Sequence, residues 1–199
     1  MTSRPKELTA SNIVAHLGDI FEHCGAQEYL GEPVTMAQHM LQGASLAVHQ
    51  GLHKAVIAAA LLHDIGHFTS EFGTFAMTDT HDRQHEVFGA KVLAPFFPER
   101  VTQCVRHHVS AKRYLCATRA DYFAQLSAAS VHSLQLQGGP MSKDDVTEFE
   151  ANPYLQDIIQ VRLLDDAGKV ASMQTYEFPY FVELLQELVD QHSSLTLGH

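Results

Sequence analysis

A histidine and an aspartate that are adjacent in sequence, His63 and Asp64, end an apolar segment in the stretch AALLHDIGHF, residues 59–68. An imidazole nitrogen and a carboxylate oxygen suit zinc, manganese or non-haem iron, and the lack of a nearby cysteine disfavours a structural zinc site. Neighbouring side chains lie about 100° apart around a helix, so both reach one ion only where the helix ends or is distorted. Gly66 provides that freedom. The ordinary alternative is that Asp64 caps a turn and His63 is a half-buried surface residue.

The sequence contains 14 histidines, and this excess prompts a search for further ligands. His39 lies within a predicted helix beside Met36 and Met40, so it faces inward either as a ligand or as an ordinary core histidine. His81 and His85 are four residues apart, a spacing that places both on one face of a helix.

Two further pairs carry candidate ligands. Of the neighbours His107 and His108, at most one is expected to point inward. Asp165 and Asp166 end the apolar run IIQVRLLDD, where a carboxylate could cap the helix, pair with Arg162 or bind a metal. Each candidate has an ordinary structural explanation when taken alone, so the interpretation depends on their combination.

These candidates fall on separate predicted helices. Apolar residues recur at spacings of three and four almost throughout the chain, without a convincing strand pattern. The predicted helices lie between Ser11 and Gly25 and at about 35–49, 54–64, 81–93, 98–109, 120–136, 153–170 and 178–192, and a short acidic helix is predicted from Ser142. The segment 54–64 is apolar on nearly all sides, which indicates a helix at the centre of a bundle. Residues 69–80 read as a loop long enough to be functional. We therefore predict an all-α helical bundle.

Length and charge limit the classes of protein and partner. We expect residues 1–199 to form one domain, with a core at about 11–192 and a frayed tail. Thirteen basic and 23 acidic residues give a net charge of −10, which argues against a nucleic-acid partner. The longest apolar run, 55–62, is too short to span a membrane. The first residues lack the apolar centre of a signal peptide, so we expect a cytoplasmic protein without a membrane partner.

The order of the candidate ligands, H…HD…H…H…D on separate helices, resembles the HD-domain superfamily. The resemblance implies a single HD-domain helical bundle in which the HD core holds one ion. It further implies that two more histidines add a second ion, with Asp64 bridging the two. The implied metal ligands are His39, His63, Asp64, His85, His108 and Asp165. Asp165 is preferred to Asp166 because it lies four residues before Lys169, similar to the D-x-x-x-K ending of the oxygenase branch.

Four segments narrow the resemblance: YLGEPVTMAQH (29–39), HDIGH (63–67), HHVSAKRYL (107–115) and LSAASVHSLQLQGGPM (126–141). Together they resemble the mixed-valent di-iron oxygenases that cleave the carbon–phosphorus bond of 1-hydroxy-2-aminoethylphosphonates. The resemblance implies two iron ions, Fe(II) and Fe(III), with O₂ as co-substrate, and an organophosphonate as the small-molecule substrate. The products would be phosphate and glycine betaine or glycine. A separate 2-oxoglutarate-dependent hydroxylase would supply the 1-hydroxyphosphonate.

The resemblance also assigns residues to the substrate. His67, Lys112 and Arg162 match phosphonate contacts, and Ser130 is a further candidate. Each of the first three also has an ordinary explanation: His67 as a histidine at a helix end, Lys112 as a solvated lysine, and Arg162 as part of an intrahelical salt bridge. In the family a tyrosine and a glutamate form a lid, so that Tyr29 and Glu32 join Asp64 as catalytic candidates and Glu32 faces the ammonium end. Without the resemblance, we would interpret Tyr29 as an ordinary packed side chain and Glu32 as a solvated carboxylate.

The ammonium end distinguishes a primary amine from a trimethylammonium group, which donates no hydrogen bond and prefers an aromatic or methionine-lined pocket. Phe72, Phe75 and Met77 in the loop could provide one, so we expect a preference for the trimethylated substrate. The main alternative function is an HD-domain phosphohydrolase that acts on a nucleotide or phosphomonoester with the same six ligands. A non-enzymatic helical module with an accidental histidine cluster or a sensor role is a second alternative.

Overall fold

The computed structural model describes residues 7–26, 32–69 and 80–196, and it confirms the all-α prediction. The described residues form ten α-helices and one short 3₁₀ helix, without a β-strand. The elements are α1 (Ile13–His23), α2 (Met36–His49), α3 (Lys54–Leu62), α4 (Gly66–Thr69), α5 (His85–Leu93), α6 (Glu99–Thr118), η1 (Phe123–Gln125), α7 (Ala128–Leu136), α8 (Lys143–Glu150), α9 (Leu155–Ala167) and α10 (Phe178–Thr196).

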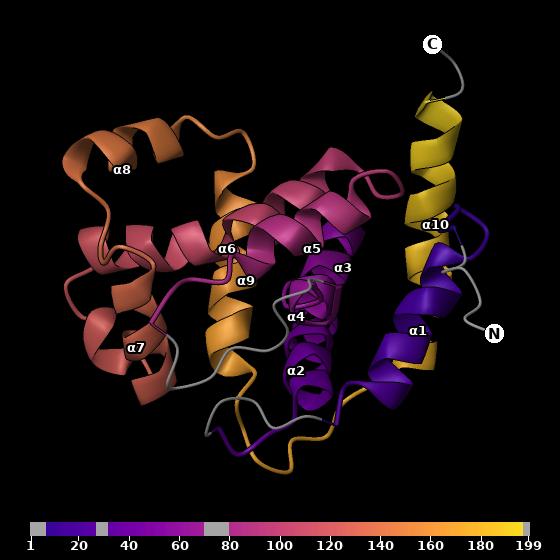
Figure 1. The fold of residues 1–199 in the computed structure, drawn as a ribbon, viewed down its shortest axis with the longest axis horizontal. Helices are drawn as coiled ribbons and strands as arrows, with labels where there is room; N and C mark the ends of the chain where they lie inside the picture. Colours follow the sequence, from indigo (N-terminus) through magenta and orange to yellow (C-terminus); the bar gives the residue numbers. More distant parts are fainter. Residues whose placement is uncertain (1–6, 27–31, 70–79, 197–199) are drawn as a thin grey trace.

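Helix α3 lies at the centre of the bundle, as its sequence predicts. Every residue from Ala55 to Leu62 is buried, and α3 packs against α2, α6, α9 and α10. Helices α1 and α10 run side by side along one edge of the molecule, while α7 and α8 lie at the opposite edge (Figure 1). None of the described helices is long and apolar enough to cross a membrane. The central position of α3 lets the residues that follow it meet side chains from several helices.

Local side-chain hydrogen bonds set several helix boundaries. The Thr35 side chain accepts a hydrogen bond from the Gln38 amide while the Gln38 side chain accepts one from the Thr35 amide, a capping box that starts α2. Ser142 begins α8 in the same way with Asp145. Helix α1 begins after Asn12 rather than after Ser11. These caps fix the start of each helix, and in α2 the cap therefore fixes the position of the ligand candidate His39.

Four predicted helices differ most in extent from the structure. Helix α6 continues to Thr118, beyond the predicted end at about residue 109. Helix α5 begins at His85 rather than at residue 81, because Gln84 has a left-handed conformation (φ 51°) and its amide donates to the Asp82 side chain. The predicted helix 120–136 divides into η1 and α7, and Ser127 caps α7 through the Ser130 amide. Helix α10 continues to Thr196, beyond the predicted end at about residue 192.

Gly66 has a different role from the one expected. The chain leaves α3 at Leu62, turns through residues 63–65, and begins the short helix α4 at Gly66. A Cβ atom at Gly66 would lie 1.9 Å from the carbonyl oxygen of His85 and 2.8 Å from the amide nitrogen of Gly89. Only a glycine permits this close approach of α4 to α5. Gly66 thus brings His85 near the His63–Asp64 pair, rather than simply ending the central helix.

Candidate metal centre

Two groups of histidine and aspartate side chains meet at the end of α3. The first group contains His39 from α2, His63 from the C-cap of α3 and Asp165 from α9, and all three are buried. The Nε2 atoms of His39 and His63 are 3.0 Å apart, and Asp165 Oδ1 lies 3.3 Å from His39 Nε2. These atoms face a common point, as the ligands of one ion would.

The protonation of the first pair of imidazoles follows from their other ring nitrogens. His39 Nδ1 lies 2.8 Å from the carbonyl oxygen of Gly168, and His63 Nδ1 lies 2.9 Å from that of Ala60. Since a carbonyl oxygen only accepts, each Nδ1 carries a proton and donates it. In the neutral rings both Nε2 atoms then present lone pairs to each other. Two lone pairs at this distance repel unless a cation lies between them, and ligating histidines commonly donate their second nitrogen to a carbonyl.

The second group contains Asp64, His67 from α4 and His85 from the start of α5. His85 Nε2 lies 3.1 Å from Asp64 Oδ1 and 3.1 Å from the Nε2 atom of His108 on α6. His108 donates through Nδ1 to the Val105 carbonyl oxygen at 2.7 Å, so its Nε2 atom also presents a lone pair. The rings of His67 and His85 are stacked with centroids 4.1 Å apart.

The two carboxylate oxygens of Asp64 face different groups. Oδ2 lies 3.6 Å from His39 Nε2 and 3.5 Å from His63 Nε2, whereas Oδ1 lies 3.1 Å from His85 Nε2 and 3.6 Å from His108 Nε2. Within the described chain, neither Asp64 Oδ2 nor Asp165 Oδ1 accepts a hydrogen bond, although both atoms are buried. This geometry suits a carboxylate shared between two adjacent ions.

Burial and neighbouring charges shift the pKa values of these groups in opposite directions. Burial alone would raise the pKa of Asp64, but the nearby histidines, led by His63, hold it well below its usual value. Burial lowers the pKa of His63, and burial together with His85 and His63 lowers that of His108 further. Asp64 is therefore a carboxylate while these two imidazoles are neutral, which are the protonation states that bind a metal.

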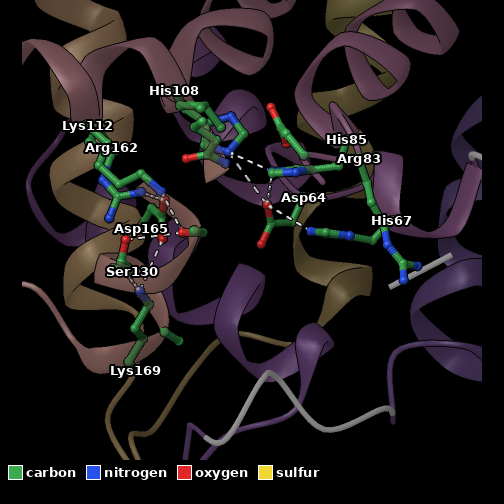
Figure 2. Close-up of a pocket in the computed structure, with 15 residues that line it drawn as sticks. Asp64, His67, Arg83, His85, His108, Lys112, Ser130, Arg162, Asp165 and Lys169 are labelled. Carbon is green, nitrogen blue, oxygen red and sulfur yellow. Dashed lines mark hydrogen bonds and ion pairs between the residues drawn. The ribbon is translucent and has the colours of Figure 1, made fainter. Parts of the chain in front are cut away.

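A cavity opens beside the two groups, and Lys112, Arg162 and Lys169 lie on the side away from His67 and His85 (Figure 2). Lys112 on α6 donates to the Ser133 hydroxyl at 2.7 Å, and Lys169 donates to the Ser130 hydroxyl at 3.2 Å. Burial, and secondly the charge of Arg162, lowers the pKa of Lys112 to about 7. With Arg83 beside His67, four cationic side chains line this cavity, which indicates a site for an anion.

Arg162 joins this cavity to the first group of ligands. It is only 3% exposed, and its Nη1 donates to Asp165 Oδ2 at 2.6 Å. Its other edge contacts Asp166 and Tyr122. Burial opposes the charge of Arg162, but Asp165 and Asp166 raise its pKa well above the usual value, so it stays a cation. Asp165 faces the histidines while Asp166 faces away from them, which distinguishes the two neighbours that the sequence left open.

The structure brings most of the sequence-predicted residues together. His39, His63, Asp64, His85, His108 and Asp165 meet at the two groups, whereas His81 is exposed and His107 lies against Phe149. His67, Lys112, Ser130 and Arg162 line the cavity, and His67 is also close enough to Asp64 and His85 to belong to the second group.

Other candidates are placed only in part or not at all. Glu32 is half-buried, and its Oε1 atom is enclosed without a hydrogen bond to the described residues. Tyr29 lies outside the described residues, as do Phe72, Phe75 and Met77.

Sequence reasoning missed several residues around the cavity. Ser133, which accepts from Lys112, is three residues after Ser130 on α7, and this helical spacing could have revealed it. Lys169 entered only as part of a motif, yet its ammonium lies 3.7 Å from Asp165 Oδ1. Tyr122 gave no signal, because it precedes a 3₁₀ helix and its contact with Arg162 spans 40 residues of sequence.

An all-α bundle in which separate helices contribute histidines and aspartates to one buried site defines a class of metal-binding helical proteins. The family model named HD domain matches residues 36–173, a range that begins at the N-terminus of α2 and includes both groups of ligands. The chain therefore belongs to the HD domain family.

Three proteins with similar sequences show which members of this family the chain resembles. The chain is 59% identical over 94% of its length to a [1-hydroxy-2-(trimethylamino)ethyl]phosphonate dioxygenase (glycine-betaine-forming) from Leisingera caerulea, of which the match covers 95%. It is 41% identical to a hydroxymethylphosphonate dioxygenase from Gimesia maris, with 83% of each chain covered. It is 32% identical to uncharacterized protein L432 of Acanthamoeba polyphaga mimivirus, over 88% of this chain and 81% of that one.

Proposed function

We propose that this protein is a di-iron oxygenase that uses O₂ to cleave the carbon–phosphorus bond of [1-hydroxy-2-(trimethylammonio)ethyl]phosphonate, giving phosphate and glycine betaine. The observation that carries the proposal is the pair of adjacent ligand groups joined by Asp64, with a cationic cavity beside them. The similarity to two phosphonate dioxygenases supports the same activity and favours it over the phosphohydrolase.

The donor atoms fit iron. The His39 and His63 Nε2 atoms are 3.0 Å apart, so both could bind one ion. Imidazole and carboxylate without thiolate are typical of non-haem iron sites. We assign His39, His63 and Asp165 to one iron and His85 and His108 to the other, with Asp64 bridging. When bound, the irons supply oxygen activation and a strong positive charge.

The residues beside the metal centre would bind and orient the phosphonate. Fe(II) and Fe(III) with two aspartates leave a charge of about +3, which attracts an anion to a protein whose overall charge is −10. Lys112 and Arg162 would donate to phosphonate oxygens, with the Ser130 hydroxyl and His67 as further donors. These contacts would hold the hydroxyl-bearing carbon next to the metal centre.

The opposite end of the substrate would face the lid residues. Glu32 Oε1 is enclosed and accepts no hydrogen bond from the described residues, so it is a suitable partner for a cation, since a buried carboxylate oxygen without a hydrogen bond is costly. Tyr29 would complete the lid. The hydroxyl group of the substrate would come from a separate 2-oxoglutarate-dependent hydroxylase, because a cleavage that starts from a 1-hydroxyphosphonate needs that group in place beforehand.

The test follows O₂ consumption and phosphate release together in the iron-loaded protein. The reaction balances with one O₂ consumed for each phosphate and each carboxylate formed, because both atoms of O₂ enter the products. We expect a ratio of 1:1. Phosphate release without O₂ uptake would identify a hydrolase instead, and a preparation without near-stoichiometric transition metal would favour a non-enzymatic module.

A second comparison tests the ammonium end. Turnover of the trimethylammonium substrate and of its primary-amine counterpart is measured by phosphate release at matched concentrations. We expect a higher kcat/KM for the trimethylated compound. Equal or better use of the primary amine would contradict this preference while leaving the oxygenase activity intact.

A further inference from the structure

Arg162 forms hydrogen bonds with two residues, Tyr122 and Asp166, that have no role in the proposed function. Its Nε atom donates to the Tyr122 hydroxyl at 3.0 Å and to Asp166 Oδ2 at 3.2 Å, and its Nη2 atom donates to Asp166 Oδ1. The Tyr122 hydroxyl donates to Asp166 Oδ2 as well. Tyr122 and Asp166 thus occupy the Nε–Nη2 edge of the guanidinium together, in a closed triangle of hydrogen bonds (the Arg162 triangle).

The Arg162 triangle lies between two cavities. Arg162 and Asp165 line the cavity beside the metal centre. On the other side of Arg162, a second cavity of about 420 Å³ is lined by Tyr122, Asp166 and Leu126. Tyr122 is only 7% exposed and the Asp166 side chain is 25% exposed. Arg162 therefore lines the cavity beside the metal centre, whereas Tyr122 and Asp166, which support it, lie outside that cavity.

Counting donors shows which N–H groups stay available to a ligand. Arg162 has five N–H groups on three nitrogens. The single Nε hydrogen goes to Tyr122 and Asp166, one Nη2 hydrogen goes to Asp166, and one Nη1 hydrogen goes to Asp165. One N–H on each Nη is left, and these two groups can donate to oxygens of a phosphonate.

From this arrangement we infer that Tyr122 and Asp166 are positioning residues, which hold Arg162 so that its two remaining N–H groups face the phosphonate. The inference rests on the proposed function. Without these supports, Arg162 is free to turn toward Asp165, its only other carboxylate contact among the described residues, and would bind that ligand candidate at the expense of the substrate. Asp166 also balances the charge of Arg162, which leaves Asp165 available to a metal.

The test uses Tyr122→Phe and Asp166→Asn in the iron-loaded protein, with calorimetric binding of inorganic phosphate as the first measurement. We expect phosphate to bind about fivefold more weakly to Tyr122→Phe and about tenfold more weakly to Asp166→Asn. The second result separates positioning from simple electrostatics. Removing a negative charge near an anion site should tighten binding if Asp166 acted only through its charge, so tighter or unchanged binding would overturn the inference.

Two contacts away from the cavity provide matched controls: a tyrosine–carboxylate hydrogen bond and an arginine–aspartate ion pair. Tyr114 donates to Glu150 at 3.0 Å, and Asp157 on α9 accepts from Arg100 at 2.6 Å. Tyr114→Phe and Asp157→Asn lose a comparable hydrogen bond or ion pair away from the cavity, and both should bind phosphate like the wild type. In all four variants the iron content should equal that of the wild type, and loss of iron from Tyr122→Phe would overturn the inference in favour of a structural role.

A double mutant tests whether Tyr122 acts through Arg162. Lysine keeps the charge of Arg162 but cannot form the two-bonded edge, so Tyr122→Phe should weaken phosphate binding no further in an Arg162→Lys background. Additive effects would contradict the inference. With the phosphonate substrate, Tyr122→Phe should raise KM about fivefold and leave kcat within twofold. A wild type that binds phosphate but consumes no O₂ would overturn the proposed function alone, since the binding measurements do not depend on turnover.

Discussion

Asp64 is the residue on which the arrangement of both ligand groups depends. Its two oxygens face different groups, and its position directly after His63 allows the end of one helix to serve both. We expect Asp64→Ala to lose iron at both positions and His63→Ala to lose it at one, because the first change removes a ligand from each group. Iron per chain measured after desalting gives the answer, with Asp157→Asn as a control that should keep its iron. Wild-type iron in Asp64→Ala would contradict the bridging assignment.

Lys112 should make substrate binding depend on pH. Its pKa is lowered to about 7 from an ordinary value of 10.5, first by burial and then by Arg162. The ammonium is therefore present below about pH 7 and is lost as the pH rises through that value. Bound iron would lower this pKa further and a bound phosphonate dianion would raise it. We expect KM to rise between pH 7 and 9 while kcat changes less.

The control for this pH dependence is Lys112→Arg, since arginine stays charged throughout the range. Its KM should be nearly constant between pH 7 and 9. Lys112→Ala should keep its iron and have a high KM at every pH, because Lys112 touches Ser133 rather than the histidines. An Arg variant with the same pH profile as the wild type would assign the titration to another group.

At the scale of the elements, the sequence predicted the helices better than their junctions. The apolar run before His63 and the Thr35 and Ser142 caps are local signals, and α2, α3 and α8 start where they indicate. Two of the boundaries that differ depend on a backbone conformation or a local hydrogen bond that residue type alone does not dictate. Gln84 takes a left-handed conformation that its own type does not dictate, and the start of α5 follows from it.

In the candidate site, the sequence likewise indicated the candidate metal ligands but not the residues that support them. The six candidate ligands were proposed from their type and order along the chain. Five of them belong to the two groups, and His108 lies next to the second group. Residues that support these ligands have no such signature. Ser133 and Tyr122 are common residue types in ordinary positions, and only the folded chain places them against Lys112 and Arg162.

The contact between α4 and α5 yields a prediction at this scale. In Gly66→Ala the new methyl group would meet the backbone of His85 and Gly89 at 1.9 and 2.8 Å, so the two helices must separate. We expect a loss of about 2–4 kcal/mol in the free energy of unfolding, with weaker iron binding through His85. Gly43→Ala on α2 is the control, because its nearest neighbour would be 3.6 Å away. Equal stability of the two variants in denaturant unfolding would contradict the role of Gly66.

In the molecule as a whole, the metal centre joins elements that are distant in sequence. Its ligand candidates come from α2, the end of α3, the start of α5, α6 and α9, so bound metal would cross-link most of the central bundle. Without metal, the buried Nε2 atoms of His39 and His63 face each other at 3.0 Å, and buried carboxylate oxygens lack hydrogen bonds within the described chain. The metal-free protein therefore carries an energetic cost at its centre.

Removing the metal should lower the stability of the whole bundle in one cooperative step. A ligand present at a hundredfold excess over its Kd stabilises the folded state by about 2.7 kcal/mol, which corresponds to about 5–10 °C in Tm for a chain of this size. We expect a Tm difference of at least that size between iron-loaded and chelator-treated protein in calorimetry. Zn²⁺ should restore the Tm without restoring O₂ consumption, because ligation stabilises the fold while oxygen activation needs a redox-active metal. The same Tm with and without metal would mean that the two ligand groups contribute nothing to holding the helices together.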